Sequence, residues 1–289
     1  MTASSSYVPP LLRPIYALKG AGKAPVNMTA RAGHQVFFFI RSLASIPIAL
    51  KHYPKEVWRL LSDVTWGNGS IVVGGGTIGV VVILSAFGGI TVGLQAYTSL
   101  DLIGMGPLTG GISAFATSRE IGPILAAAAF TAQAGCRFTA QLGSMRISEE
   151  IDALEAVAIR PLPYLVSTRI IAAMIAIIPL YCLGLVVAFL SCKFTVVLLG
   201  GSSGGTYMHY FYTFLVNTDI FYSLIKVVVF VALSTFIQCY YGFFASGGPE
   251  GVGVAAGRAI KMVFIIVVFA NLFMTLAIWG INPGIRISG

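Results

Sequence analysis

Three ionisable side chains fall within apolar stretches of this 289-residue chain, at Arg119, Glu120 and Lys226. Charged groups are costly in hydrocarbon, and in membrane segments they usually face the interior of a helix bundle or a wet cavity. Arg119 and Glu120 are adjacent and opposite in charge, so a local ion pair is one interpretation, whereas Lys226 has no sequence neighbour to pair with. The other interpretation is a cavity lined by these groups, which would suit a molecule with an anionic head and long acyl tails.

A second set of charges lies in the segment QLGSMRISEEIDALEAVAIR, and it contains four of the ten acidic residues of the chain. Ser148 can cap a short helix here, with carboxylates in the first turn, where the helix dipole favours them. An exposed amphipathic helix of this kind can bind in a groove on a soluble partner; an ordinary solvated loop is the alternative. The candidate partner-binding residues are Arg146, Glu149, Glu150, Ile151, Asp152, Leu154 and Glu155.

No motif in the sequence predicts catalysis or a bound cofactor. The P-loop pattern GxxxxGK[ST] is absent, so this chain has no such cradle for ATP phosphates. GGGTIG at Gly74–Gly79 matches a dinucleotide-binding pattern by letter, but it lies inside an apolar run. Together with Gly88, Gly89 and Gly93 it is better explained as a close helix–helix contact. The four Cys and three His show no metal-ligand spacing.

Composition indicates a membrane protein. The chain is 57% hydrophobic and only 10% charged, with a mean hydropathy of +0.88. Soluble domains carry about 25% charged residues, so a water-soluble enzyme is excluded. The net charge of +8 does not predict nucleic-acid binding, because the basic residues are not interleaved with aromatic residues in any soluble segment.

The elements that must position these charges form an all-α membrane protein. Residues 1–33 predict a flexible cytoplasmic tail. Residues 34–64 alternate apolar and basic positions and predict an amphipathic helix in the membrane interface, broken near Pro47 and Pro54; a helix packed on a partner is the alternative. Five apolar stretches in residues 65–289 can each provide the roughly 20 residues of a spanning helix. They are Ser70–Tyr97, Met105–Thr131, Tyr164–Phe194, Phe221–Ala245 and Ala259–Ile281.

The distribution of Lys and Arg predicts the orientation of these spans. With the N-terminus in the cytoplasm, only Lys193 and Arg286 of the 18 basic residues would lie outside, and Arg119 and Lys226 would lie within the membrane. The C-terminus is then periplasmic. The acidic segment near residues 146–157 connects the second and third spans and would face the cytoplasm.

The run SREIGPILAAAAFTAQAGCRFTAQLGSMRISEEIDALE, residues Ser118–Glu155, resembles the MlaE/YrbE permease family, the membrane subunits of ABC transporters that move lipids with MCE-domain proteins. The shorter runs GLQAY, YLVSTR, SLIKVVVF and YYGFFASGGPEGVGVAAGRA strengthen the likeness, which covers the chain from about residue 34. EEIDALE, GGPEGVG and the NPGIRISG terminus are similar to the B-type YrbE subunit of actinobacterial Mce systems.

The resemblance implies a function and a set of partners. The chain would form the lipid pathway with a paralogous A-type YrbE subunit in the plasma membrane, below a periplasmic tunnel of Mce proteins. A separate cytoplasmic ATPase of the MceG type would use ATP and Mg, grip the Glu149–Leu154 segment as a coupling helix, and power import of a fatty acid, mycolic acid or other lipid. Tyr97, Arg119, Glu120 and Lys226 would be polar residues of the lipid cavity.

Two other functions fit the residues. A secondary transporter or channel working alone could use Arg119, Glu120 and Lys226 as an ion pathway, although five spans without an inverted repeat argue against that class. A non-transporting membrane scaffold that anchors Mce proteins is the third possibility.

Overall fold

The computed structural model describes residues 33–66 and 76–280, and no strand occurs within these ranges. The chain divides into two units, Met1–Ala44 and Ser45–Gly289. In the first unit, residues 33–44 are helical. The predicted tail lies outside the described residues, apart from Gly33.

Two short helices open the second unit, α2 (Ile46–His52) and α3 (Pro54–Trp66). Pro47 lies in the first turn of α2, and Pro54 is the first residue of α3. Proline suits the first turn because an N–H there would have no partner within the helix. The predicted breaks near these two prolines are therefore confirmed.

The α3 helix is amphipathic. One face packs against the apolar residues Ile171 and Ala172 of the later helix α9 (Thr168–Leu198), while the basic residues Lys55 and Arg59 are exposed. The residues that α3 buries are Val57, Leu60 and Val64. The placement of residues 34–64 in the membrane interface stays a prediction.

Four long helices correspond to four of the five predicted spans. They are α4 (Gly76–Asp101), α9 (Thr168–Leu198), α11 (Asn217–Phe243) and α12 (Gly248–Trp279). Each is long and apolar enough to cross a bilayer, α9 together with the π-helical turn η6 (Leu162–Ser167) before it. The helical run Gly33–His52 also meets these requirements by length and composition.

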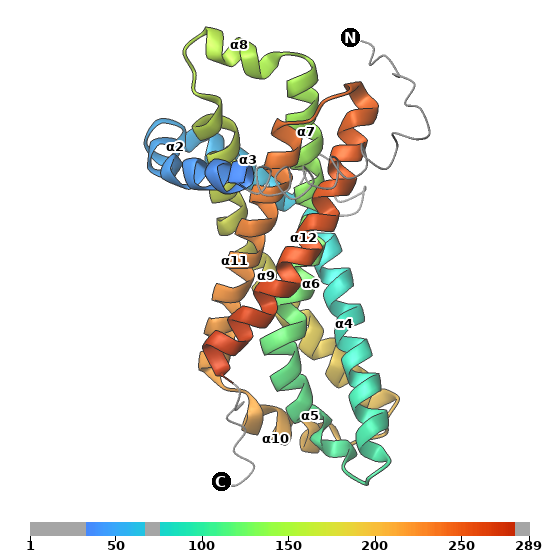
Figure 1. The fold of residues 1–289 in the computed structure, drawn as a ribbon. Coiled ribbons are helices and arrows are strands. Elements are labelled where there is room, and N and C mark those ends of the chain that lie inside the picture. The colour runs from blue at the N-terminus through green and yellow to red at the C-terminus, as the bar shows by residue number, and fades with distance from the viewer. Residues whose placement is uncertain (1–32, 67–75, 281–289) are drawn as a thin grey trace, which may run out of the picture. The chain divides into compact units, whose positions relative to one another are not determined.

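The span predicted at Met105–Thr131 is a succession of short helices that extends beyond it. These are η3 (Gly106–Leu108), α5 (Thr109–Ile112), η4 (Ser113–Ile121), α6 (Gly122–Phe130), η5 (Thr131–Gly135) and α7 (Cys136–Ile147). Both η4 and η5 are π-helical. From α5 to α7 this broken helix runs alongside the four long helices, from one end of the unit to the other (Figure 1). With it, the expected fold of five helical passes is confirmed.

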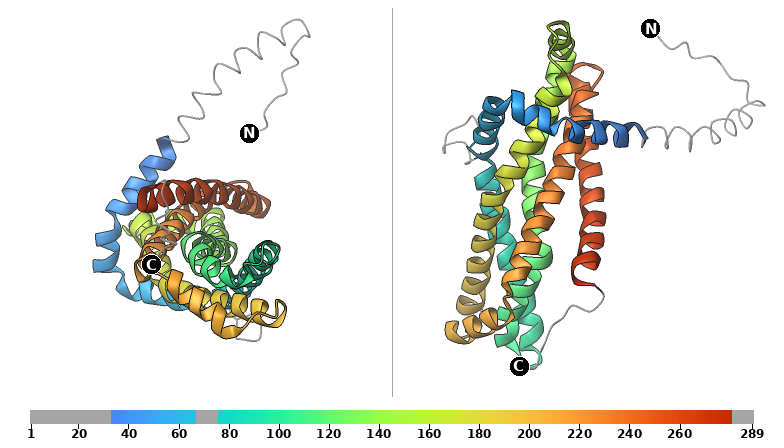
Figure 2. Two further views of the ribbon diagram at one scale, coloured as in Figure 1. Left: turned by 90° about the horizontal axis from the view of Figure 1, so that it is seen from below. Right: turned by 90° about the vertical axis from the view of Figure 1, so that its left-hand side faces the viewer.

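Seen end-on, these five passes lie side by side in a single bundle of helices (Figure 2). The tightest packing joins α4 and α9, where small residues recur every fourth position on both helices. Ser85, Gly89 and Gly93 of α4 face Gly184, Ala188 and Cys192 of α9. A Cβ atom at Gly89 would overlap the carbonyl oxygen of Ala188. The predicted role in close helix contact is confirmed for Gly88, Gly89 and Gly93: the last two face α9, and Gly88 faces the Leu125 side chain of α6.

Two short helices mark the ends of the second unit. Between α7 and η6, α8 (Glu150–Ala156) lies at the upper end in Figure 1, and α10 (Gly204–Phe214) lies at the lower end. The sequence analysis identifies no helix at α10, where Phe and Tyr recur among small and polar residues. It packs its Tyr207 and Phe211 on α5 and α9, next to Ala114 and Cys192.

Candidate functional site

A buried ion pair joins two helices that are distant in sequence. Arg119 of η4 donates from Nε to Asp219 Oδ2 at 2.7 Å, and a second guanidinium nitrogen lies 2.7 Å from the same oxygen. Trp279, at the end of α12, donates from Nε1 to the other Asp219 oxygen at 2.8 Å. The guanidinium also lies over the Phe115 ring, 4.3 Å from its centroid. Two residues, Arg119 and Trp279, thus satisfy both oxygens of Asp219, as a buried carboxylate requires.

Lys226 of α11 is fully buried and makes three hydrogen bonds through its ammonium group. Nζ donates to the Arg119 carbonyl oxygen at 2.8 Å, to Thr275 Oγ1 at 2.7 Å and to Glu120 Oε1 at 3.2 Å. These three bonds use the whole donor capacity of an ammonium group.

Proline at position 123 explains the first of these bonds. Pro123 has no N–H to donate to the carbonyl groups one turn earlier in the helix, those of Ser118 and Arg119. In a membrane segment such carbonyl groups need another donor. Lys226 supplies one for Arg119, and the Tyr181 hydroxyl, at 3.4 Å, supplies a longer one for Ser118.

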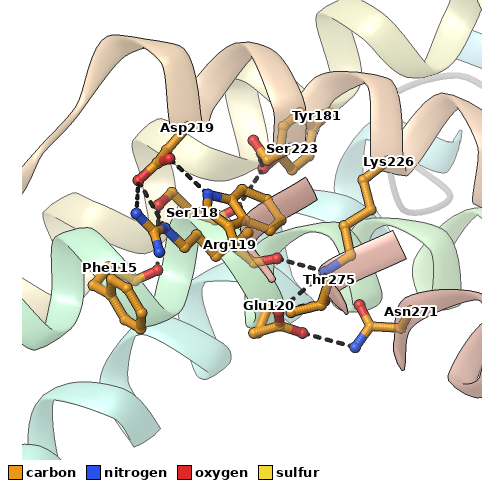
Figure 3. Close-up of polar contacts among 11 residues, drawn as sticks. Phe115, Ser118, Arg119, Glu120, Tyr181, Asp219, Ser223, Lys226, Asn271 and Thr275 are labelled. Atoms are coloured by element: carbon orange, nitrogen blue, oxygen red, sulfur yellow. Dashed lines mark hydrogen bonds and ion pairs between the residues drawn. The ribbon is translucent and has the colours of Figure 1, made fainter. Parts of the chain in front are cut away.

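Glu120 points to the opposite side from Arg119 and connects to α12 (Figure 3). Its Oε2 accepts from Asn271 Nδ2 at 2.7 Å, and its Oε1 accepts from Thr275 Oγ1 at 2.7 Å in addition to Lys226. The Glu120 side chain is 33% exposed in the single chain, while that of Lys226 is completely buried. Of the four charged residues in the network, Glu120 is therefore the one that the surroundings can reach.

The structure brings three of the four predicted cavity residues into one polar network, in which Arg119 pairs with Asp219 and Glu120 with Lys226. Arg119 and Glu120 do not pair locally; each binds an acceptor or donor on α11 or α12. Successive helix residues point in directions about 100° apart, so two neighbours in sequence can contact different helices. Sequence reasoning missed the partners Asp219, Asn271, Thr275 and Trp279. The one available signal was polar residues at spacing four, Asn271 and Thr275, inside an apolar span.

Tyr97 makes different contacts. Its hydroxyl donates to the Gly200 carbonyl oxygen, and its ring packs against the apolar cluster that contains Val92, Cys192 and Tyr207. The common cavity of Tyr97, Arg119, Glu120 and Lys226 stays a prediction.

The acidic segment near residues 146–157 forms the exposed helix α8. Ile151 is the buried anchor, and Arg146 of α7 donates to Asp152 Oδ1 at 2.7 Å across the turn. Of the next apolar residues on the same side, Leu154 is half-buried and Val157 is exposed. The exposed acidic residues of this segment are Glu149, Glu150, Asp152 and Glu155.

The predicted cap by Ser148 is wrong. Ser148 ends α7, and its hydroxyl donates to the Ser144 carbonyl oxygen or to Glu150 Oε1 rather than accepting a backbone N–H of α8. The residue that precedes α8 is Glu149, whose φ of 59° lies in the left-handed region. This backbone reversal is what turns α8 away from α7, and side-chain patterns in the sequence do not reveal it.

Within residues 33–66 and 76–280, no group of three or more His, Cys, Asp and Glu side chains could hold a metal ion. Two features of the second unit make up the candidate site. One is the buried polar network between η4, α11 and α12, and the other is the exposed acidic helix α8 at the far end of the same unit.

Comparison with known proteins supports a transport role. The sequence profile of the family described as Permease MlaE matches residues 68–277. A Rickettsia bellii protein named a probable ABC transporter permease is 25% identical over 254 residues, covering 88% of this chain and 94% of that protein. The Haemophilus influenzae protein named intermembrane phospholipid transport system permease protein MlaE is 24% identical over 268 residues, covering 91% and 97%.

A plant protein is also similar. The chloroplastic protein TRIGALACTOSYLDIACYLGLYCEROL 1 of Arabidopsis thaliana is 29% identical over 199 residues, covering 69% of this chain and 57% of that protein. The region matched by the family profile begins before α4 and includes α8 and every residue of the polar network except Trp279. With five helical passes and a family match over most of its length, the chain is a multi-pass membrane protein that belongs to the MlaE permease family.

Proposed function

We propose that this chain is the permease subunit of an ABC-type lipid transporter and that a separate ATPase binds at α8. The observation that carries this proposal is α8 itself, a short helix with exposed carboxylates held at one end of the bundle by buried Ile151 and by the Arg146–Asp152 ion pair. A helix held in this way can transmit force from a soluble partner to α7 and η6, because it is fastened to the bundle rather than free.

Two further observations support the proposal. The sequence has no P-loop, so the energy of ATP must come from another chain. Relatives across most of its length are named ABC transporter permeases, and one is named a phospholipid transport permease. Phospholipid is accordingly the first substrate class to test; fatty or mycolic acids are the alternative that follows from the Mce likeness.

The remaining partners are part of the same proposal. The lipid pathway would be completed by a paralogous YrbE A-type subunit, with Mce proteins forming a tunnel on the periplasmic side and an MceG-type ATPase using ATP and Mg in the cytoplasm. Glu120 is partly exposed next to buried Lys226. This pair would meet the lipid head group where the second permease subunit closes the pathway.

The decisive experiment is charge reversal on α8. The Glu149→Lys, Glu150→Lys double variant should insert normally but lose co-purification of the ATPase, because the introduced lysines would be repelled by the surface that attracts the carboxylates in the wild type. Glu250→Lys is the matched control, since Glu250 is an exposed carboxylate at the same end of the bundle, on α12. Wild-type ATPase retention in the double variant contradicts the assignment of α8.

The two alternative functions have their own tests. Lipid movement by the purified chain in liposomes, without any ATPase, would establish a stand-alone transporter. Lipid uptake that survives an Arg119→Ala, Lys226→Ala double change, with the protein still folded, would favour a scaffold role.

A further inference from the structure

A polar pocket of about 930 Å³ opens near α8, apart from the network of Arg119 and Lys226. It is formed by α3, α7, α8 and α9, which approach one another at the upper end of the unit in Figure 1. Its lining residues are Arg59, Leu60, Ser62, Asp63, Ala140, Gln141, Ser144, Met145, Glu150 and Arg169.

Arg169 in this pocket is a buried cation without an anionic partner. The residue is only 6% exposed, and one guanidinium nitrogen donates to the Leu165 carbonyl oxygen at 2.6 Å. A second nitrogen reaches Gln141 Oε1 at the long distance of 3.5 Å, and Nε has no partner at all. No carboxylate of the described residues lies within ion-pair distance of it. Burial of an uncompensated charge is costly, so the pocket favours an anion at Arg169.

The other charges at the pocket are already compensated within the protein. Asp63 pairs with Arg137 at 3.1 Å, and Arg59 pairs with Glu56 at 2.5 Å, which raises the pKa of Arg59 above its ordinary value. Glu150 is exposed and accepts a hydrogen bond from Ser148. Arg169 is thus the charge in the lining whose compensation must come from a ligand.

An apolar groove of about 500 Å³ adjoins the polar pocket and shares Ser62 with it. It runs between α3 and α9, and its α9 residues, Ile175 to Pro179, follow Arg169 by six to ten positions. At 1.5 Å per residue, the groove therefore begins roughly 9 Å and ends roughly 15 Å further along α9. Its lining residues are Trp58, Leu61, Ser62, Thr65, Trp66, Ile175, Ala176, Ile178 and Pro179.

The order of these features along α9 matches one class of ligand. An anion site, an adjoining apolar groove deeper along a membrane helix, and two exposed Trp side chains beside the groove are the features that an amphiphile needs. We propose that Arg169 binds the phosphate of a membrane phospholipid whose acyl chain lies in the groove between α3 and α9. This site lies outside the polar network and does not depend on transport, because it is a binding property of this chain alone.

The test measures phospholipid binding to the full-length protein in detergent. Dioctanoyl phosphatidylglycerol and dioctanoylglycerol have the same acyl chains, but only the first has a phosphate. Wild-type protein should bind the phosphatidylglycerol about tenfold or more tightly, as expected for hydrogen bonds to a charged group. Equal affinity for the two lipids overturns the proposal, and this arm needs no substitution.

Variants then locate the site. Arg169→Gln should lose that preference, Arg169→Lys should keep most of it, and Arg258→Gln should leave it unchanged, since Arg258 is an exposed arginine at the same end of the bundle. An unchanged preference in a folded Arg169→Gln protein contradicts the assignment. Inorganic phosphate at millimolar concentration should not displace the lipid; displacement would identify a site for free anions instead. ATPase binding is not measured, so failure here is distinct from failure of the α8 proposal.

Discussion

At the scale of single residues, the polar network is a consequence of one proline. Pro123 leaves carbonyl groups of η4 without helical donors, and Lys226 of α11 donates a hydrogen bond to one of them. That lysine is buried, so it in turn needs a carboxylate, which Glu120 provides. The dependence runs in three steps. Pro123 leaves the Arg119 carbonyl without a helical donor, Lys226 donates to that carbonyl, and Glu120 compensates the charge of Lys226.

Removing the charge at Lys226 tests this dependence. Lys226→Met should lower the free energy of unfolding by roughly 3 kcal/mol, the low end for a broken buried pair, because Glu120 is one-third exposed and can be partly hydrated. The measurement is thermal unfolding in detergent. The double variant Lys226→Met, Glu120→Gln should recover part of the loss, since no unpaired charge remains. If the double variant is less stable than Lys226→Met, the pair does not act as described.

At the scale of elements, the contact of α4 with α9 depends on side chains that are small on both helices. Gly89 has no room for a Cβ because the backbone of Ala188 lies against it, and backbone cannot rotate away as a side chain can. Gly257 of α12 lies in the same kind of helix but faces open space. These two glycines therefore separate the effect of close packing from the effect of helix propensity.

Alanine substitution at these positions should give opposite results. Gly89→Ala should destabilise the protein by about 1–3 kcal/mol, because the two helices must separate to accept the methyl group. Gly257→Ala should be neutral or stabilising by up to about 1 kcal/mol, because alanine is the better helix former. Thermal unfolding of both variants in detergent provides the comparison. Equal effects at the two positions would mean that the α4–α9 contact tolerates an extra methyl group.

At the scale of the second unit, its two ends differ in chemistry. One end presents the acidic helix α8 and the pocket around Arg169, and the other presents the aromatic helix α10. The bias of Lys and Arg predicts that the α8 end is cytoplasmic. A protein with this orientation would offer α8 to an ATPase and α10 to periplasmic partners.

Cysteine accessibility in intact cells tests the orientation. Thr206→Cys on α10 should react with a membrane-impermeant maleimide in intact cells, whereas Glu155→Cys on α8 should react only after permeabilisation; both positions are exposed. The unsubstituted protein, with its four native cysteines, is the control for background labelling. The reverse pattern would place the ATPase partner on the wrong side for α8 and contradict the proposed function.

The sequence alone was sufficient for the class of fold and for most of the passes. Apolar runs of sufficient length and a shortage of charge determine a membrane-spanning helix whatever its neighbours are, because the bilayer requires it. The predicted boundaries of α9 and α11 and the predicted end of α4 consequently fall within a turn or two of those observed, while the predicted start at Ser70 lies outside the described residues. The start of α12 at Gly248 and the existence of α10 were missed, because polar and aromatic helix ends outside the hydrocarbon have no such requirement.

Only the tertiary structure decided which charges meet. Their position in apolar stretches identified Arg119, Glu120 and Lys226 as costly groups, and a local pair of the first two was one of two interpretations. The observed partners Asp219, Asn271 and Thr275 are separated from Arg119 and Glu120 by a hundred residues or more along the chain. Arg169 likewise looks like an ordinary basic residue at the end of a span, and only the packing of α3 and α7 around it reveals a buried cation beside a pocket. The sequence specifies which polar groups need a hydrogen-bond or ion-pair partner, and the arrangement of the helices determines which residues are those partners.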